Sequence, residues 1–275
     1  MLGKSLLALL IALAFFLIAK KSLPIPDRSG KEITKPSTLL ASAQEKLLKV
    51  ATFNIQTGKS ADGVRNINNA ADLINDQHLV GIQEIYAPGW LNKLGLDMVG
   101  FGQSQLVELT KDKGFGYLLA STRRRWFREQ RGNAVLSRLP IDQWRILNLP
   151  DYTGKSFRNM TIVDLMWQGV PIKFINTHLH TTKGREEQLE IVLAEFAKHP
   201  IAILVGDFNS RRDAQLLAKI LEDPSVTDAI SHANIDTQDP ENRIDWILTK
   251  GFKVEHGKVV EKGISDHPYL SLIHI

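Results

Sequence analysis

Short apolar runs alternate with amphipathic stretches along most of the chain. The segments 47–54, 79–84 and 201–205 have the length and composition of buried strands. Two stretches repeat apolar residues at helical spacing: Val64, Ile67, Ala71 and Ile74, and Leu189, Val192, Leu193 and Phe196. A further helix is expected around residues 213–221. This alternation predicts an α/β protein.

The middle and the end of the chain are richer in strands than in helices. Strand-like segments occupy 114–121, 133–141, 158–167, 171–179, 244–249, 252–260 and 268–275. The dipeptide Gln168-Gly169 has the chemistry of a hairpin turn. Hairpins interleaved with helices imply either one mixed sheet or two sheets packed together with helices outside. A pure dinucleotide-binding fold fits poorly, and neither Gly-x-Gly-x-x-Gly nor a Walker sequence occurs.

The amino-acid composition limits the possible chemistry of the protein but says little about its fold. The 275-residue chain contains no cysteine, which excludes a disulfide framework, a thiolate zinc site and a cysteine nucleophile. Any metal must therefore be held by oxygen or imidazole ligands. The net charge of +4 fits an anionic partner, but an ordinary soluble surface could carry it equally well.

The N-terminus carries an uncharged, mostly apolar run from Ser5 to Ala19, followed by two lysines. As a helix this run spans about 22 Å, short of the roughly 30 Å hydrocarbon core, which suits a signal sequence or a short anchor. No small-x-small cleavage site follows it. We therefore expect an uncleaved anchor at 1–21, a tether at 22–46 and a catalytic domain at 47–275. The domain would lie outside the cytoplasmic membrane, in the periplasm or the extracellular space.

The stretch "ILVGDFNS" places polar side chains directly after a strand. Gly206 ends the apolar run, and the carboxyl ends of strands are where open α/β sheets bind ligands. In extended chain Asp207 and Asn209 point the same way, while Phe208 returns to the core. The alternative is a simple turn, because Asp and Asn also bond their own backbone.

Other strands also end or begin with polar residues that suit a site. They are Asn54, Glu84, Asn176, His178, Asp245, Asp266 and His267. Each alone has a structural explanation as a turn former, a solvated acid or a core histidine. Together they converge on one chemistry, because carboxylate and amide oxygens are the ligands that Mg²⁺ prefers.

These motifs, in this order, resemble the endonuclease/exonuclease/phosphatase superfamily, which has the deoxyribonuclease I-like fold. The resemblance rests on an Asn-ended first strand, Gln-Glu, Asn-x-His, Gly-Asp-Phe-Asn and a late Ser-Asp-His, and it covers residues 47–275. "GNAVLSRLPI" (132–141) also looks like a segment of bacterial members. The resemblance implies a four-layer α/β/β/α sandwich of two packed mixed sheets, and divalent-metal-dependent cleavage of phosphate esters.

The resemblance also implies a role for each residue. Glu84 would be the principal metal ligand, with Asn54 and Asp266 nearby, for Mg²⁺ or for Mn²⁺ as its substitute. Asp207 would orient or deprotonate the attacking water, and Asn209 would bond the phosphoryl oxygen. His267, paired with Asp245, would stabilise the pentacovalent state, with His178 opposite. Arg158 and Asn176 would bind the substrate phosphate.

Two features depart from the nuclease patterns. Gln56 stands where abasic-site endonucleases have an acid on the metal side. The segment "GFGYLLA" (114–120) lacks the acid that orients the histidine in deoxyribonuclease-like members, which leaves the orientation of His178 open.

The segment "TRRRWFREQR" (122–131) holds five arginines and two aromatics. It would suit a nucleic-acid backbone or an anionic membrane surface, or it is a solvated hairpin loop.

We therefore expect an anchored Mg²⁺-dependent phosphodiesterase, with an endonuclease as one form of it. The alternative is a phospholipid or sphingolipid phosphodiesterase, or a phosphatase, because a tether brings the site close to lipid headgroups. A catalytically dead binding module is disfavoured, because no motif position is lost. The motifs recognise only a phosphate and a metal, so the substrate stays open between nucleic acid and phospholipid headgroup, and so does the oligomeric state.

Overall fold

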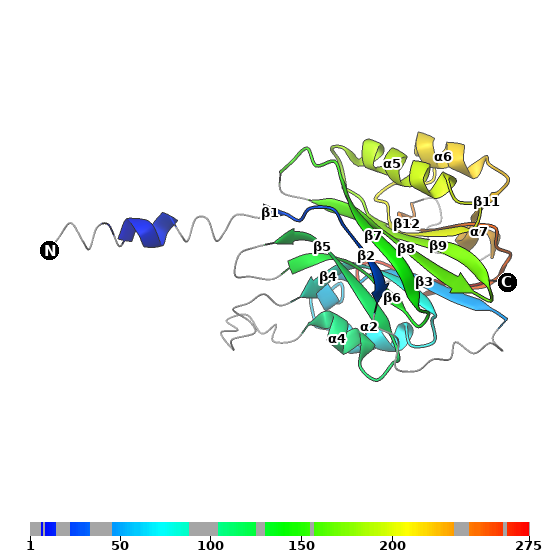
Figure 1. Ribbon diagram of the computed structural model, residues 1–275, viewed down its shortest axis with the longest axis horizontal. Coiled ribbons are helices and arrows are strands. Elements are labelled where there is room, and N and C mark those ends of the chain that lie inside the picture. Colours follow the sequence, from blue (N-terminus) through cyan, green and yellow to red (C-terminus); the bar gives the residue numbers. More distant parts are fainter. Residues whose placement is uncertain are drawn as a thin grey trace.

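Two mixed sheets pack face to face with helices on both outer faces in the computed structural model (Figure 1). The structure describes residues 7, 9–14, 23–33, 46–87, 104–124, 130–154, 157–233, 242–260 and 263–274. The predicted α/β sandwich is confirmed.

The first sheet has seven strands among the described residues. Their order is β1 (Leu23–Pro24), β5 (Gly116–Arg124), β6 (Gln130–Ser137), β4 (Leu79–Ala87), β3 (Leu48–Asn54), β14 (Tyr269–His274) and β13 (Val254–Val260). Strands β3 and β4 run parallel, and the other pairs are antiparallel.

The second sheet also has seven strands in the described ranges. Their order is β11 (Val226–Asp228), β12 (Asp245–Lys250), β10 (Ala202–Asp207), β9 (Val170–His178), β8 (Arg158–Trp167), β7 (Ile141–Leu149) and β2 (Arg28–Ile33). Here β9 and β10 form the parallel pair. In both sheets the parallel pair lies near the centre, which brings two carboxyl ends together.

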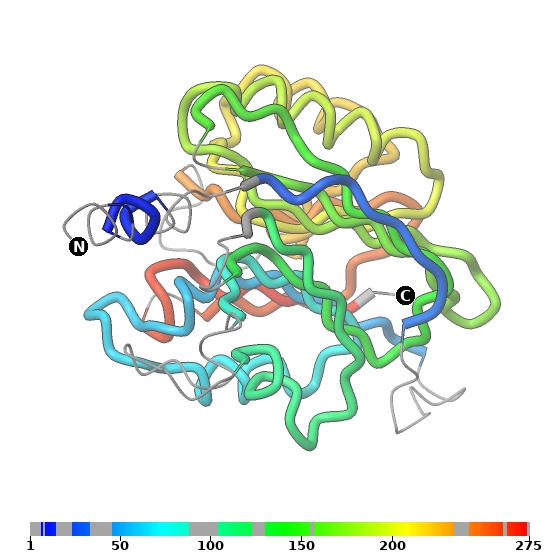
Figure 2. Tube along the Cα trace, turned by 60° about the vertical axis from the view of Figure 1, so that its left-hand side comes forward, coloured from blue at the N-terminus to red at the C-terminus, as the bar shows by residue number. Residues whose placement is uncertain are grey.

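Helices cover the outer faces of the two sheets, as the turned view of Figure 2 shows. Helices α2 (Ile67–Leu73) and α4 (Gln105–Thr110) lie on the first sheet, and α5 (Arg185–Ala197) and α6 (Gln215–Leu221) lie on the second. The short η1 (Gln56–Gly58) follows β3, and α7 (Ala229–His232) follows β11. The helices bury the outward-facing side chains of the central strands.

Strict alternation sorts the central strands into inner and outer rows. In β10, Ile203 and Val205 belong to the core between the sheets, whereas Ala202 and Leu204 pack under the helices. In β3, Val50 faces inward and Phe53 faces α2. Burial of each such aliphatic side chain contributes about 1.5–3 kcal/mol, so a shift of register by one residue is strongly disfavoured.

Two glycines allow close approach where the sheets and strands meet. A Cβ on Gly81 would lie 2.4 Å from Val205 Cγ2 across the sandwich. Gly206 has φ +143°, and a Cβ there would lie 2.0 Å from the carbonyl oxygen of Thr177 on β9. The glycine of "GDFN" is therefore required by the backbone as well as by the end of the strand.

Most predicted elements are present, but one strand was missed and one segment was misjudged. Residues 133–141 divide between the end of β6 and the first residue of β7, and β7 itself was not predicted. Its register shifts between Ile141 and Gln143, which breaks the alternation that identifies a strand. Val64 lies before α2 and is 61% exposed, although its spacing predicted a helical position.

Part of the predicted tether belongs to the sandwich. Strand β2 pairs with β7, and β1 pairs with the end of β5. The backbone of the segment thus completes the edges of both sheets, although its polar composition resembles a linker. The prediction that residues 22–46 form a free tether is wrong for residues 23–24 and 28–33.

The predicted anchor falls largely outside the described residues. Residues 9–14 are helical, and no helix in the described part of the chain is long and apolar enough to cross a membrane. The arginine-rich segment is described only at its ends, where β5 reaches Arg124 and β6 begins at Gln130.

Candidate active site

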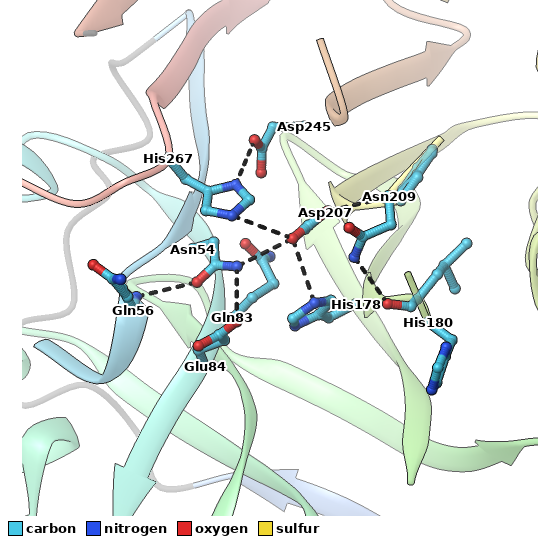
Figure 3. A network of polar contacts seen from close by, with 12 residues as sticks. Asn54, Gln56, Gln83, Glu84, His178, His180, Asp207, Asn209, Asp245 and His267 are labelled. Carbon is cyan, nitrogen blue, oxygen red and sulfur yellow. Dashed lines mark hydrogen bonds and ion pairs between the residues drawn. The ribbon is translucent and has the colours of Figure 1, made fainter. Parts of the chain in front are cut away.

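Polar residues replace apolar ones in the inner rows at one end of the sandwich. In β9 the inward row runs Ile172, Phe174, Asn176, His178, and in β10 it runs Ile203, Val205, Asp207. We call this the active-site end, formed by the carboxyl ends of β3, β4, β9 and β10. Figure 3 shows the side chains of His178, Asp207 and His267 turned toward one another at this end.

Strand register places three of the predicted residues level with one another. Asp207 pairs with His178 on the parallel strand β9 and with Asp245 on the antiparallel strand β12. All three are almost fully buried. The second sheet therefore presents a carboxylate flanked by an imidazole and a second carboxylate.

Asp207 is the centre of the cluster. Its Oδ2 lies 3.3 Å from His178 Nε2 and 3.7 Å from His267 Nε2, and it accepts a hydrogen bond from Asn54 Nδ2 at 3.1 Å. Burial, together with the nearby charge of Asp245, raises the pKa of Asp207 to about 7. A carboxylate with such a pKa can exchange a proton near neutral pH.

His267 is held by the second carboxylate. Its Nδ1 donates to Asp245 Oδ2 at 2.8 Å, and its Nε2 faces Asp207. Burial opposes the charged ring, but the Asp245 hydrogen bond and the charges of Asp245, Asp207 and Asp266 raise the pKa of His267 to about 9. The ring is therefore an imidazolium at neutral pH. The predicted pairing of His267 with Asp245 is present.

His178 differs from His267 in its charge. Burial, and then the positive charges of Arg158, His267 and His180, lower the pKa of His178 well below its usual value. The Nε2 of this ring lies 3.3 Å from Asp207 Oδ2. Asp207 is thus the carboxylate that faces His178, a neighbour the sequence did not identify.

Arg158 begins β8 beside this cluster. Burial lowers its pKa, while the charges of Asp207, Glu84 and Asp151 oppose that shift. Its Nε is buried without a hydrogen-bond partner in the described structure. An unpaired guanidinium nitrogen next to the carboxylates fits the predicted role in binding a phosphate.

Glu84 comes from a break in β4. Its φ is +57°, and the pairing of β4 with β6 shifts between Ile82 and Ile85. This strained backbone turns Glu84 out of the buried row, and its side chain is partly exposed. Asn54 Nδ2 donates to Glu84 Oε1 at 3.4 Å.

Asn54 connects the two halves of the site. Its amide nitrogen donates to both Glu84 and Asp207, and its Oδ1 accepts from the Gln56 backbone N–H at 3.1 Å. Ser265 Oγ donates to the Asn54 carbonyl at 2.7 Å and lies 3.2 Å from Asp266 Oδ1. A metal-ligand role for Asn54 would require its Oδ1, and in this structure that oxygen accepts the Gln56 N–H.

The oxygen donors around Asn54 fit a hard divalent cation. Glu84 and Asp266 are partly exposed, and Asn54 or the adjoining Ser265 contacts each. Asp207, Asp245 and His267 also lie close enough to form a metal group. However, both ring nitrogens of His267 face carboxylates, so this group is a proton-sharing network and Glu84 is the better metal ligand.

Asn209 does not follow the simple alternation that predicted its direction. Its φ is +48°, and its Nδ2 donates to the Leu179 carbonyl at 3.0 Å. Asp207 Oδ1 meanwhile accepts from the Asn209 backbone N–H at 2.9 Å. Asp207 therefore forms the turn that the sequence offered as an alternative and also belongs to the site. Its Oδ1 accepts from the turn backbone, and its Oδ2 faces the two histidines. Phe208 packs in the outer core as expected.

Asn176 lies between the sheets and not in the site. It is fully buried, accepts from Gln83 Nε2 at 2.7 Å, and donates to the carbonyls of Ile82 and Ala134. The prediction that Asn176 binds the substrate phosphate is wrong, since its amide is already saturated. It stands one inward position deeper than His178.

Sequence reasoning missed two residues that support the site. Gln83 bridges Thr52 and Asn176 across the sandwich, and its inward position in β4 was the available signal. Arg185 donates to the carbonyls of Thr181 and Asn209 and so clamps the loop that carries Asn209. No sequence signal distinguished Arg185 from an ordinary helix-start residue.

Comparisons with known proteins were consistent with this geometry. Residues 51–267 match the model of the Endonuclease/Exonuclease/phosphatase family. No curated protein matches the chain. Three solved structures with the same fold are 17–23% identical to the chain.

One is an endonuclease/exonuclease/phosphatase from Beutenbergia cavernae, with 23% identity, coverage of 84% of this chain and 72% of that chain, and a TM-score of 0.64. A mannosyl-6-phosphatase from Bacteroides thetaiotaomicron has 17% identity, coverage of 83% and 99%, and a TM-score of 0.62. A humanized TDP2 from D. rerio has 17% identity, coverage of 84% and 100%, and a TM-score of 0.61. At these identities the structures support the fold alone.

Proposed function

Since the chain belongs to the endonuclease/exonuclease/phosphatase family, we propose that it is a Mg²⁺-dependent phosphodiesterase that uses an activated water. The observation that carries this proposal is Asp207, a buried carboxylate with a pKa of about 7 between a neutral and a charged histidine. That arrangement suits proton transfer during hydrolysis.

Each residue has a task in the proposed reaction. Asp207 takes a proton as a water oxygen attacks phosphorus and the bond to the leaving oxygen breaks. The imidazolium of His267 donates toward the charge that develops on the phosphoryl oxygens, and Asp245 keeps it protonated. His178 holds Asp207 in place, and Arg158 binds the phosphate. Glu84 and Asp266 would hold the divalent cation, which would polarise the phosphoryl oxygen.

A substrate screen tests the proposal. Purified full-length protein with Mg²⁺, Mn²⁺ or chelator would be assayed with bis(p-nitrophenyl) phosphate, p-nitrophenyl phosphate, DNA, RNA, phospholipid vesicles and inositol phosphates. We expect metal-dependent cleavage, with the diester preferred over the monoester. Preference for the monoester would indicate a phosphatase. Hydrolysis of none of these esters, or full turnover in excess chelator, would overturn the proposal.

We also propose that the apolar run from Ser5 to Ala19 is an uncleaved anchor and that the domain lies outside the cytoplasmic membrane. The run is followed by Lys20-Lys21 without a cleavage site. Full-length protein should appear in the membrane fraction and should be degraded by protease added outside that membrane. A soluble chain beginning near residue 20, or protection from the protease, would contradict this placement.

A further inference from the structure

The chain enters the sandwich at the active-site end. Strand β1 pairs Leu23 with Arg124, at the end of β5. Next along the chain, Asp27 accepts a hydrogen bond from the Asn148 backbone N–H, and the Asn148 side chain donates to the Ile25 carbonyl, both at 2.7 Å. Residues 23–27 are thereby fixed to both sheets.

The strand register shows that this entry point is level with the active site. In the second sheet Asn148 on β7 pairs with Asn159 on β8. The register of β8 and β9 places Asn159 next to His178, which pairs with Asp207 on β10. Four strand spacings of about 4.8 Å separate β2 from β10, so the entry lies about 20 Å to the side of Asp207. In Figure 1, β1 marks this end of the sandwich.

Very little chain separates the entry from the apolar run. Only Lys20, Lys21 and Ser22 stand between Ala19 and Leu23. Four residue steps of extended chain reach about 14 Å at most. If the run is held in a bilayer, the active-site end cannot be far from its surface, whereas a free tether of 25 residues would have let the domain turn in any direction.

Exposed side chains alone do not identify the end that faces the bilayer. Val64 and Tyr152 are 61% and 51% exposed in loops at the active-site end. Met166 and Val170 are 45% and 41% exposed at the opposite end, beside the turn that joins β8 and β9. The entry of the chain distinguishes the two ends, because it is fixed at one of them.

We propose that the active-site end lies against the bilayer that holds the N-terminal run, and that the substrate is a phosphate ester in a lipid headgroup. This inference rests on the hydrolytic function and the anchor proposed above. A headgroup at that surface could reach Arg158 and Glu84 without any movement of the domain away from the bilayer. A polymer in bulk solution would have to enter between the active-site end and the membrane.

Orientation can be measured without any assay of activity. The chain has no cysteine, so Val64→Cys and Val170→Cys each introduce a single exposed thiol at opposite ends of the sandwich. Strand β8, with ten residues from Arg158 to Trp167, separates these ends by about 30 Å. Full-length variants would carry a fluorophore and be reconstituted into phosphatidylcholine/phosphatidylglycerol vesicles with nitroxide-labelled headgroups.

We expect the label at position 64 to be quenched several-fold more than the label at position 170. Insertion of a 20-residue Gly/Ser linker between Ser22 and Leu23 should remove most of that difference, because its coil reaches about 25 Å. Equal quenching without the linker, or stronger quenching at position 170, would overturn the proposed orientation.

The substrate class is tested on the same vesicles. We expect release of the phosphorylated or free headgroup from vesicle phospholipid, and a fall in that release in the linker variant, while hydrolysis of soluble bis(p-nitrophenyl) phosphate stays within twofold. Hydrolysis of the soluble diester with no release from any vesicle lipid would overturn the headgroup assignment and leave the hydrolytic function standing. Loss of both reactions would instead contradict the hydrolytic function, while the quenching ratio would still decide the orientation.

Discussion

The two sheets supply their parts of the site in different ways. The second sheet contributes His178, Asp207 and Asp245 from a level row across three strands, all buried and in regular register. The first sheet contributes Glu84 from a strained break in β4, with a partly exposed side chain. Regular register suits groups that exchange protons with one another, and an irregular, wetter backbone suits a group that must reach a cation.

The largest loss of activity should come from a substitution in the buried half of the site, which the second sheet supplies. Asp207→Asn keeps the shape of the side chain but removes the base, so kcat with bis(p-nitrophenyl) phosphate and saturating Mg²⁺ should fall about a thousandfold. Thermal unfolding should not become easier, because the variant removes a buried charge whose pKa is already raised to about 7. A rate within tenfold of the unmodified protein would show that Asp207 only forms a turn.

The exposed half of the site, which carries Glu84, should respond to the metal. Glu84→Gln should lower kcat/KM about a hundredfold or more and remove the rise in Tm that we expect Mg²⁺ to cause in the unmodified protein. Glu84→Gly is the matched control for backbone strain, because glycine tolerates φ +57°. It should lose activity as well while gaining about 1 kcal/mol of stability. An unchanged Mg²⁺-dependent rise in Tm in both variants would place the cation elsewhere.

A smaller effect, visible mainly in the pH profile, should follow at the pair of His267 and Asp245. The pKa of His267 is about 9, so activity that needs the imidazolium should be lost as the pH rises through about 9. Asp245→Asn removes the hydrogen-bonding carboxylate and should move that alkaline limb down by at least one pH unit. The ratio of rates at pH 6 and pH 9 measures the shift. If the alkaline limb of the pH profile does not move in this variant, the loss of activity at high pH belongs to a group other than His267.

Glu195 on helix α5 is a charged group outside the site whose contribution to stability can be compared with that of the site residues. Glu195 there contacts Arg145 Nη2 at 2.8 Å and Lys198 Nζ at 2.7 Å, and although burial opposes it, these hydrogen bonds lower its pKa to about 2. A lowered pKa adds stability above the unfolded value near 4.5, and that stability is lost as the pH falls toward 2.

Because solvent screens the exposed partners Arg145 and Lys198, Glu195→Gln should cost less than the full shift implies, about 2 kcal/mol at pH 7 and progressively less below pH 4. Denaturant unfolding of both proteins at pH 7 and at a pH below 4 measures how the loss of stability changes with pH. The rate of hydrolysis should stay within twofold of that of the unmodified protein. A cost that does not change with pH would mean that packing, and not charge, is lost.

The regular half of the site was largely predictable from the sequence. Asp207 and His178 end apolar runs and Asp245 begins one, and strand pairing brings the three together. Asn176 obeyed the same alternation but stood one step deeper, where only the packing of the first sheet shows that Gln83 saturates its amide.

The irregular features were not predictable by the same reasoning. The left-handed residues Glu84 and Asn209 depart from any periodic pattern, and the register shift at the start of β7 concealed a whole strand. Strand β2 has a linker's composition because, at the edge of a sheet, its backbone and not its side chains provides the binding. Such features depend on tertiary contacts that local sequence does not encode.

The central claim is that the polar end of the inter-sheet layer is a metal-dependent hydrolytic site. It is tested most directly by titrating Mg²⁺ into metal-free full-length protein and following binding by calorimetry and bis(p-nitrophenyl) phosphate hydrolysis in parallel. We predict no turnover without metal, a rate that rises with the same midpoint as binding, and neither response in Glu84→Gln. Turnover that is independent of added Mg²⁺ and survives excess chelator would contradict the account.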